Sequence, residues 1–201
     1  MALALEMLAP GFIVAAPALR DPNFDHAVVL LCMHGDEGAM GLVVNRPARI
    51  TLGEIMRQMD LECRVGGSQP AMVGGPVGLE NGLLLYEVDG IAGHTEVDGH
   101  GGVDGSGASG LRVAEQLCLS PDQALLREIG NGQGPSRYHI FIGHAGWAPQ
   151  QLEQEIAQGA WIPTRLDLEL IFSTPIEDRW ERALGAEGVH PAQVGSFRPV
   201  N

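Results

Sequence analysis

The chain has 201 residues, of which 45% are hydrophobic and 18% charged, and its formal net charge at pH 7 is −13. This composition excludes wholesale disorder, and no stretch approaches the roughly 18 apolar residues that a membrane-spanning helix needs. All 12 basic residues are arginines, which excludes Schiff-base chemistry and the lysine-dependent phosphate sites of P-loop proteins and kinases. The negative charge repels nucleic acid and anionic membranes, so we expect neither to be a direct partner.

The N-terminal third is predicted to form strands. Apolar runs at residues 11–16, 26–33 and 39–44 are rich in valine and leucine and are bounded by proline or glycine. Because these runs are continuous rather than alternating, we expect the strands to be covered on both faces. The loop of residues 34–38, between the second and third runs, is predicted to close a hairpin.

Capping chemistry predicts three helices, and side-chain spacing predicts a fourth. In three places a Ser or Thr precedes a Glu or Gln by three residues, which is the pattern of a capping box. These boxes begin at Thr51, before residues 52–59, at Ser120, before residues 121–129, and at Thr174, before residues 175–184. Residues 149–158 form the fourth predicted helix, with Leu152 and Ile156 on one face.

Further strands are expected between the helices, at residues 82–88, 113–119, 137–142 and 168–172. The irregular interleaving of strands and helices favours an α+β fold with a mixed sheet over a doubly wound parallel fold. Neither a repeat nor a second domain is evident. We therefore predict a single domain over residues 1–201, with a glycine-rich acidic loop at about 91–110 and an irregular tail from about 186.

The cysteines predict a reducing environment. Cys32, Cys63 and Cys118 are widely and singly spaced, which favours free thiols over a disulfide framework or a C-x-x-C site. The apolar N-terminus carries Glu6 and Pro10 and lacks the basic region of a signal peptide. We expect a cytoplasmic protein.

Two motifs suggest a metal or a cofactor. His94, Glu96, Asp98 and His100 could converge on one face of a strand, but the glycines around them favour a solvated loop. Gly105-x-Gly107-x-x-Gly110 matches a dinucleotide-binding string, but it lacks the strand that must precede it. We expect neither a metal nor a cofactor.

Several further strings occur along the chain in a fixed order. They are Pro17-x-x-x-Asp21-Pro22-x-Phe24, His34-x-x-x-Gly38-Ala39-Met40-Gly41-Leu42-x-x-Asn45-Arg46-Pro47, Gly74-Gly75-Pro76-Val77, Gly134-Pro135, Gly143-x-Ala145-Gly146-Trp147-x-x-x-Gln151-Leu152-Glu153-x-Glu155 and Trp161. Together they resemble the YqgE/AlgH family of bacterial proteins, from about residue 11 to residue 185. The family usually has tyrosine where His144 stands and glycine where Gln150 stands.

The resemblance implies an α+β fold with a curved, bifurcated mixed sheet and about four peripheral helices. Some members of the family carry the label of a transcriptional regulator. In a chain with this charge and without a helix-turn-helix or a basic stripe, such regulation is expected to act through a protein partner rather than through DNA.

Our leading hypothesis is a non-enzymatic binding or regulatory protein whose partner is a protein or a small molecule. The candidate surface consists of Asp21, His34, Asn45, Arg46, Gly74, Gly75, Pro76, Trp147 and Gln151. In this hypothesis Asn45 hydrogen-bonds a ligand, Arg46 holds an anion, and the glycines permit close approach. The alternative is that these positions are turns that need unusual backbone angles.

A rival function is an enzyme, such as a hydrolase, that uses a His/Asp pair for acid–base catalysis. His34 with Asp21 or Asp36 is the candidate pair, because these residues lie near predicted strand ends. No recognised nucleophile motif accompanies them.

Overall fold

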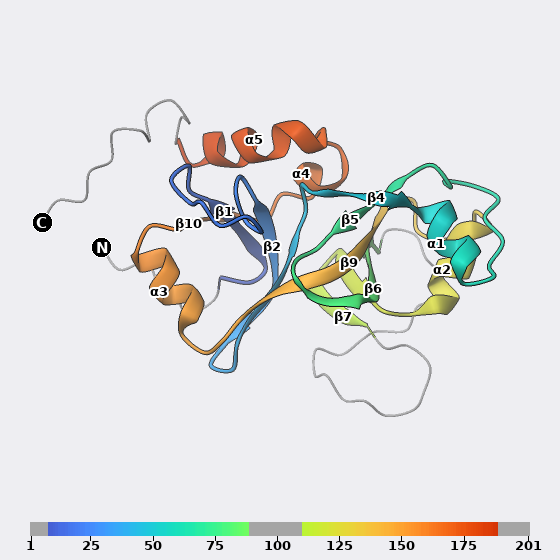
Figure 1. Ribbon diagram of the computed structural model, residues 1–201, viewed down its shortest axis with the longest axis horizontal. Coiled ribbons are helices and arrows are strands. Elements are labelled where there is room, and N and C mark those ends of the chain that lie inside the picture. The colour runs from blue at the N-terminus through green and yellow to red at the C-terminus, as the bar shows by residue number, and fades with distance from the viewer. Residues whose placement is uncertain (1–7, 89–109, 189–201) are drawn as a thin grey trace, which may run out of the picture. The chain divides into compact units, whose positions relative to one another are not determined.

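Figure 1 shows the computed structural model of the chain, which describes residues 8–88 and 110–188. These residues form ten strands and five α-helices, and the fold is α+β, as predicted. No helix among them is long and apolar enough to cross a membrane. The strands are β1 (Gly11–Ala15), β2 (Val28–Gly35), β3 (Gly38–Val43), β4 (Pro47–Thr51), β5 (Pro70–Val73), β6 (Val77–Glu87), β7 (Leu111–Ala114), β8 (Leu117–Ser120), β9 (Tyr138–Trp147) and β10 (Trp161–Arg165). The helices are α1 (Leu52–Gln58), α2 (Gln123–Gly130), α3 (Gln151–Ala157), α4 (Leu168–Phe172) and α5 (Arg179–Ala186), with a short 3₁₀ turn, η1 (Ile176–Asp178), before α5.

The chain divides into two compact units. The first combines the chain up to Arg46 with residues 74–77 and the chain from His144 onward. The second combines Pro47–Val73 with Gly78–Gly143. That the two units behave as one domain stays a prediction.

In the first unit, the strand order β10–β1–β2–β3–β9 is antiparallel throughout. Val29 and Leu31 of β2 pack into the same core as Leu152 of α3. Val28 and Leu30 alternate with them and point to the opposite face, and all four strand residues are fully buried. In Figure 1, α5 lies along that opposite side of β1, β2 and β10. The prediction of strands covered on both faces is therefore confirmed.

The second unit contains a parallel pair of strands. β4 pairs antiparallel with β5, β5 runs parallel to β9, and β6, β8 and β7 follow in that order beyond β9. β9 pairs with β5 near Phe141 and with β3 near Ala145. The sheet is therefore mixed and branches at β9, as the resemblance implied.

The predicted hairpin is confirmed, and one predicted strand is in fact a second hairpin. Gly35 pairs with Gly38, so Asp36 and Glu37 form the turn between β2 and β3. The single strand expected at residues 113–119 is replaced by β7 and β8, which pair with each other.

The strand predicted at residues 168–172 is wrong, because this segment forms helix α4. Asp167 caps that helix, and its Oδ1 accepts a hydrogen bond of 2.9 Å from the Glu169 backbone N–H. A run of five residues in which four are apolar fits a buried helix face as well as a strand, and only the cap distinguishes the two.

Two of the three predicted capping boxes are also wrong. Asp122, rather than Ser120, caps α2 by accepting from the Ala124 backbone N–H at 2.7 Å. Thr174 donates its hydroxyl to the Glu169 carbonyl at 2.9 Å, so it closes α4 instead of starting α5. The helix predicted at residues 175–184 starts later than expected, at Arg179 of α5, with η1 preceding it.

The capping box of α1 is confirmed, and it predicts a pH dependence. Glu54 accepts hydrogen bonds from the Thr51 backbone N–H at 2.8 Å and from its hydroxyl at 2.9 Å. These bonds, the backbone bond first, lower the pKa of Glu54 below its usual 4.5. Because the folded-state pKa is lowered, the stabilisation is present above the usual pKa and is lost as the pH falls through the lowered one.

We therefore expect Glu54→Gln to reduce the free energy of unfolding more at pH 7 than at pH 3, as measured by urea titration at both values. Glu115→Gln, in the exposed turn between β7 and β8, is the control and should show no such trend. An equal loss for Glu54→Gln at both pH values would contradict the role of the ionised carboxylate.

Candidate functional site

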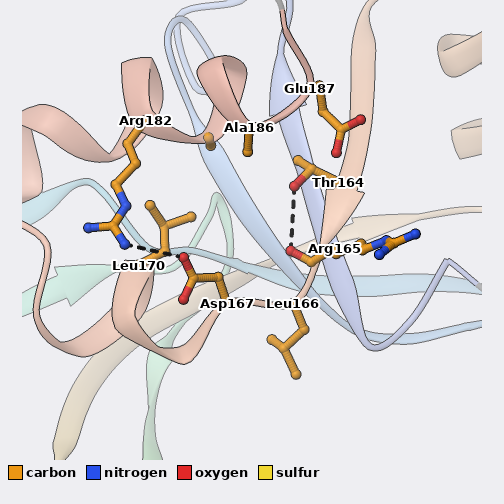
Figure 2. A pocket seen from close by; sticks show the side chains of 9 residues that line it. Thr164, Arg165, Leu166, Asp167, Leu170, Arg182, Ala186 and Glu187 are labelled. Atoms are coloured by element: carbon orange, nitrogen blue, oxygen red, sulfur yellow. Dashed lines mark hydrogen bonds and ion pairs between the residues drawn. The ribbon is translucent and has the colours of Figure 1, made fainter.

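The first unit contains an open pocket of about 420 Å³ between the end of β10, the start of α4 and the last turn of α5 (Figure 2). None of the nine predicted site residues lines it. Those residues lie elsewhere in the same unit.

Asn45 holds the chain segment that leads into β2. Its side-chain Oδ1 accepts a hydrogen bond from the Val28 backbone N–H at 2.8 Å, and its Nδ2 donates to the His26 carbonyl at 2.8 Å. Donor and acceptor are both engaged within the protein, so the side chain fixes the backbone on both sides of Ala27.

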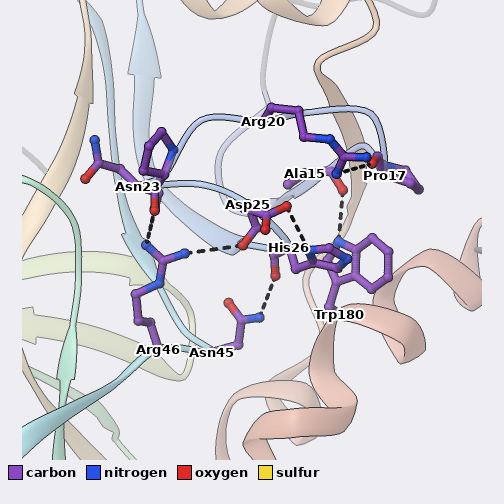
Figure 3. Close-up of polar contacts among 10 residues, drawn as sticks. Ala15, Pro17, Arg20, Asn23, Asp25, His26, Asn45, Arg46 and Trp180 are labelled. Atoms are coloured by element: carbon purple, nitrogen blue, oxygen red, sulfur yellow. Dashed lines mark hydrogen bonds and ion pairs between the residues drawn. The ribbon is translucent and has the colours of Figure 1, made fainter.

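Arg46 supports the exposed loop that precedes this segment. Its guanidinium donates to the carbonyl oxygens of Pro22, Asn23 and Asp25. Figure 3 shows Arg46 and Asn45 reaching this stretch from one side. We call residues 21–26 the 21–26 loop. Its backbone carbonyls accept hydrogen bonds from the side chains of Asn45 and Arg46, both of which belong to the predicted candidate surface.

The 21–26 loop begins and ends with local side-chain contacts. Asp21 Oδ1 accepts from the Asn23 backbone N–H at 2.7 Å, which forms an Asx turn. His26 has a positive φ of 55°, uncommon for a residue other than glycine, and its ring lies 4.2 Å from that of Trp180. Its Nδ1 is 2.8 Å from Asp25 Oδ1, and the two side chains are 52% and 48% exposed.

The middle of the loop is anchored on two buried tryptophans. The Phe24 ring stacks on Trp147 with centroids 6.0 Å apart and meets Trp161 edge-on at 5.4 Å. Both indole N–H groups donate to one oxygen of Glu155, at 3.0 and 2.8 Å. Trp147 is therefore a buried residue with a satisfied N–H, and Phe24 connects it to the loop.

Gln151 stabilises the start of α3 from the surface. Its Oε1 accepts from the Ala148 backbone N–H at 3.0 Å, and its Nε2 donates to the second oxygen of Glu155 at 2.9 Å. Glu155 thus receives three side-chain hydrogen bonds, although it was not among the predicted site residues.

His34 is buried rather than placed in an open site. Its side chain is 4% exposed, and Nε2 lies 2.9 Å from Glu153 Oε1. Nδ1 is buried and has no hydrogen-bond partner among the described residues. His34 is thus paired with Glu153, and the hydrogen bonds of Asp21 are made within its own loop.

The Gly74–Gly75–Pro76 turn lies against β9. The Gly74 carbonyl accepts from the Val43 backbone N–H at 2.8 Å. A Cβ on Gly75 would stand 2.3 Å from the His144 carbonyl carbon and oxygen, so only glycine fits there. Pro76 is exposed. Gly75, whose φ is +155°, therefore lets this turn approach the backbone of β9.

The structure thus joins Asp21, Asn45 and Arg46 at the 21–26 loop, and Trp147 and Gln151 at α3. Sequence reasoning missed the residues that connect these two groups, namely Phe24 and Glu155. The spacing of Gln151 and Glu155, four apart on a helix, was the signal that could have indicated their contact.

The described residues contain no group of three or more His, Cys, Asp or Glu side chains placed to hold a metal ion. The His94–His100 motif and most of the glycine string that starts at Gly105 lie outside the described residues.

Comparison with known proteins identifies the family. A UPF0301 protein of Anaeromyxobacter sp. (strain Fw109-5) is 39% identical over 92% of this chain and 90% of its own length. A UPF0301 protein of Methylococcus capsulatus is 37% identical over 92% of this chain and 91% of its own length.

The solution structure of the AlgH protein from Pseudomonas aeruginosa matches with a TM-score of 0.73 and 28% identity, covering 100% of this chain and 99% of that one. A Corynebacterium diphtheriae protein of known structure shares the fold, with a TM-score of 0.71 and 22% identity over 94% of this chain and 92% of that one. The AlgH-like family model matches residues 12–192, and the chain therefore belongs to the AlgH-like family.

Proposed function

We propose that the protein is a non-enzymatic, cytoplasmic binding protein that recognises a protein partner through the 21–26 loop and exerts a regulatory role through that partner. The observation that carries this proposal is an exposed loop held in one conformation by Asn45, Arg46 and the Phe24–Trp147 stack. Fixing an exposed segment before binding reduces the entropy cost of association.

The chemistry of the loop favours a basic partner surface. The exposed side chains of Asp21 and Asp25 present carboxylates, and the whole chain carries a formal charge of −13. The charge of Arg46 faces backbone carbonyls, so in this proposal Arg46 supports the loop rather than holding an anion. Complementary charge steers such an encounter and makes it sensitive to salt.

The cysteines support the cytoplasmic assignment. All three are free thiols, as predicted. Burial raises the pKa of Cys32 to about 12, so that thiol stays protonated and unreactive at neutral pH. Free thiols are typical of a reducing compartment.

Partner capture tests the proposal. Immobilised wild-type protein should retain a partner from lysate at low salt, and the double variant Asp21→Asn/Asp25→Asn should lose it. The matched control is Glu62→Gln/Glu115→Gln, which removes two exposed carboxylates from the second unit. Equal recovery by the loop variant and the control would refute the loop as the recognition surface.

Removing the supports of the loop should affect stability and mobility. Asn45→Ala leaves the Val28 N–H and the His26 carbonyl without their partner, and we expect a loss of about 2 kcal/mol in the free energy of unfolding. Arg46→Ala should mainly raise amide hydrogen exchange in residues 23–27, with Arg49→Ala, on the exposed side of β4, as the control. If both variants leave folding, exchange and partner recovery unchanged, the proposed role of the loop fails.

A second candidate function is an enzyme, such as a hydrolase, that uses a His/Asp pair. The observation that favours it is the exposed pair of Asp25 and His26, in which the carboxylate contacts the ring at Nδ1. A hydrolase screen that compares wild type with His26→Gln and His34→Gln tests this function. Turnover lost only in His26→Gln would support it, and absence of turnover in the wild type would favour the binding protein.

A further inference from the structure

His26 is held between a carboxylate and an indole ring at the end of the 21–26 loop. Its Nδ1 lies 2.8 Å from Asp25 Oδ1, and its ring centroid lies 4.2 Å from that of Trp180 (Figure 3). Its backbone carbonyl accepts from Asn45 Nδ2 at 2.8 Å. Trp180 is fixed as well, since its indole N–H donates to the Ala15 carbonyl at 2.9 Å. The imidazole is therefore positioned beside the Asp25 carboxylate.

Protonation of this ring changes the charge of the loop. The 21–26 loop contains three ionisable side chains, those of Asp21, Asp25 and His26. The two aspartates give the loop a formal charge of −2 while His26 is neutral, and the charge becomes −1 when His26 is protonated. Carboxylates stay ionised down to about pH 5, whereas an imidazole changes charge near neutral pH. His26 is therefore the side chain of the loop whose charge changes between pH 8 and pH 5.5.

The elements packed around His26 contribute charges that are constant over this range. Guanidinium groups stay protonated and carboxylates stay ionised, so neither adds a pH dependence of its own. The nearby carboxylates and the face of the Trp180 ring favour the imidazolium, and the guanidinium groups disfavour it. Besides Asp21 and Asp25, the charged residues of the segment before the loop, of the turn between β3 and β4, of η1 and of the first turn of α5 are Arg20, Arg46, Glu177, Asp178, Arg179 and Glu181.

A protonated His26 competes with a partner for the Asp25 carboxylate. In the function proposed above, Asp21 and Asp25 attract a basic surface. An imidazolium 2.8 Å from Asp25 pairs with that carboxylate and repels the incoming positive charge, and the neutral ring does neither. Because the two side chains are 52% and 48% exposed, solvent screens the pair, and the change of affinity is a few-fold rather than complete.

We propose that His26 makes recognition by the 21–26 loop pH-sensitive, so that a basic partner binds while His26 is neutral and is released as the pH falls and His26 gains a proton. This inference rests on the function proposed for the loop. The switch is confined to one side chain, because the hydrogen bonds from Asn45 and Arg46 to the loop involve backbone carbonyls that do not titrate.

Peptide binding at two pH values tests the proposal. The probe is hexa-arginine with acetylated and amidated ends, whose charge is the same at pH 5.5 and pH 8. We expect the wild-type protein to bind it at least about threefold more weakly at pH 5.5 than at pH 8, at one low salt concentration. Fluorescence anisotropy of a labelled peptide measures both affinities. Equal affinities at the two pH values would overturn the proposal.

Replacing His26 isolates its contribution from those of the other histidines. His26→Asn removes the titrating ring, and asparagine tolerates the positive φ of 55° at this position. The ratio of the two affinities should approach one in this variant. His144→Asn, on β9 in the same unit, is the matched control and should keep the wild-type ratio. The same ratio in His26→Asn as in wild type would overturn the proposal.

The variant Asp21→Asn/Asp25→Asn separates this proposal from the function on which it rests. If this variant binds the peptide at pH 8 as tightly as wild type does, the loop is not the recognition surface, and both proposals fail. If the variant loses binding at pH 8 but His26→Asn keeps the wild-type pH dependence, the loop recognises basic surfaces and only the role of His26 fails.

Proton release provides a second readout, because the coupling between two ligands of one protein is reciprocal. If protonation of His26 weakens peptide binding, then peptide binding displaces protons from His26. Calorimetry at about pH 6.5, in buffers of different ionisation enthalpy, measures this release. It should occur in the wild type and be reduced in His26→Asn. Equal proton release in the two proteins would overturn the proposal.

Discussion

Replacing Glu155 with alanine is expected to lower the free energy of unfolding by about 4 kcal/mol, because two buried indole N–H groups lose their acceptor at once. Trp147 and Trp161 are 6% and 3% exposed, so water cannot readily replace the carboxylate oxygen. The change also removes the acceptor of Gln151, which makes a further contact at the start of α3.

Glu155→Gln is the matched comparison for this prediction. Its amide oxygen can still accept from both indoles, but its NH₂ group faces the NH₂ group of Gln151, which can accept from it only by giving up its bond from the Ala148 N–H. We expect a loss of about 1–2 kcal/mol, which reflects the weaker bonds of a neutral acceptor. Urea unfolding followed by tryptophan fluorescence measures both variants. Equal losses for alanine and glutamine would show that the hydrogen bonds to the indoles contribute little.

Gly75→Ala is expected to cost at least about 3 kcal/mol or to prevent folding. The added Cβ would stand 2.3 Å from the His144 carbonyl carbon and 2.4 Å from the Ala145 nitrogen, and φ at this position is +155°. Both neighbours are backbone atoms of β9, so no side chain can rotate away to make room. Relief would require β9 to move from the 74–76 turn.

Gly146→Ala provides the control on the same strand. A Cβ there meets nothing within 4 Å, and alanine loses less backbone entropy than glycine on folding. We expect its stability to equal or slightly exceed that of wild type, as measured by thermal and urea unfolding. A similar loss for both glycine variants would contradict the steric explanation for Gly75.

The elements that were predicted correctly are those whose signal lies in a short stretch of the sequence. The apolar runs of β1, β2 and β3 are long enough to be read as strands, and Thr51 with Glu54 forms the predicted capping box. β10 was missed because Pro163 interrupts its pattern, and proline is tolerated there since β10 is an edge strand among the described strands, paired with β1. α4 was assigned as a strand because a run of five residues, four of them apolar, is too short to show a helical period.

The sequence was enough to select residues of the candidate site, but it did not predict which groups these residues contact. Asn45 and Arg46 were singled out as part of a motif and for the chemistry of their side chains, yet their partners are backbone groups 17 to 24 positions earlier in the chain. His34 is paired with Glu153, 119 positions away. Such pairs depend on how strands are ordered in the sheet, and a single sequence contains no local signal for them. The pocket at the end of β10 was missed for the same reason, because β10, α4 and α5 meet only in the folded unit.

The segments of the two units alternate along the chain, and this order has a consequence during synthesis on the ribosome. The segments of the second unit lie between residues 47 and 143, whereas the first unit needs both the chain before Arg46 and the chain after His144. At a typical elongation rate of about 5–20 residues per second, β1, β2 and β3 are made roughly 6–24 seconds before β10 pairs with β1. During that interval the nascent strands present apolar side chains without the helices that later cover them. The N-terminal third is therefore the part of the nascent chain with the greatest need of a chaperone, and the second unit is the first part that can fold.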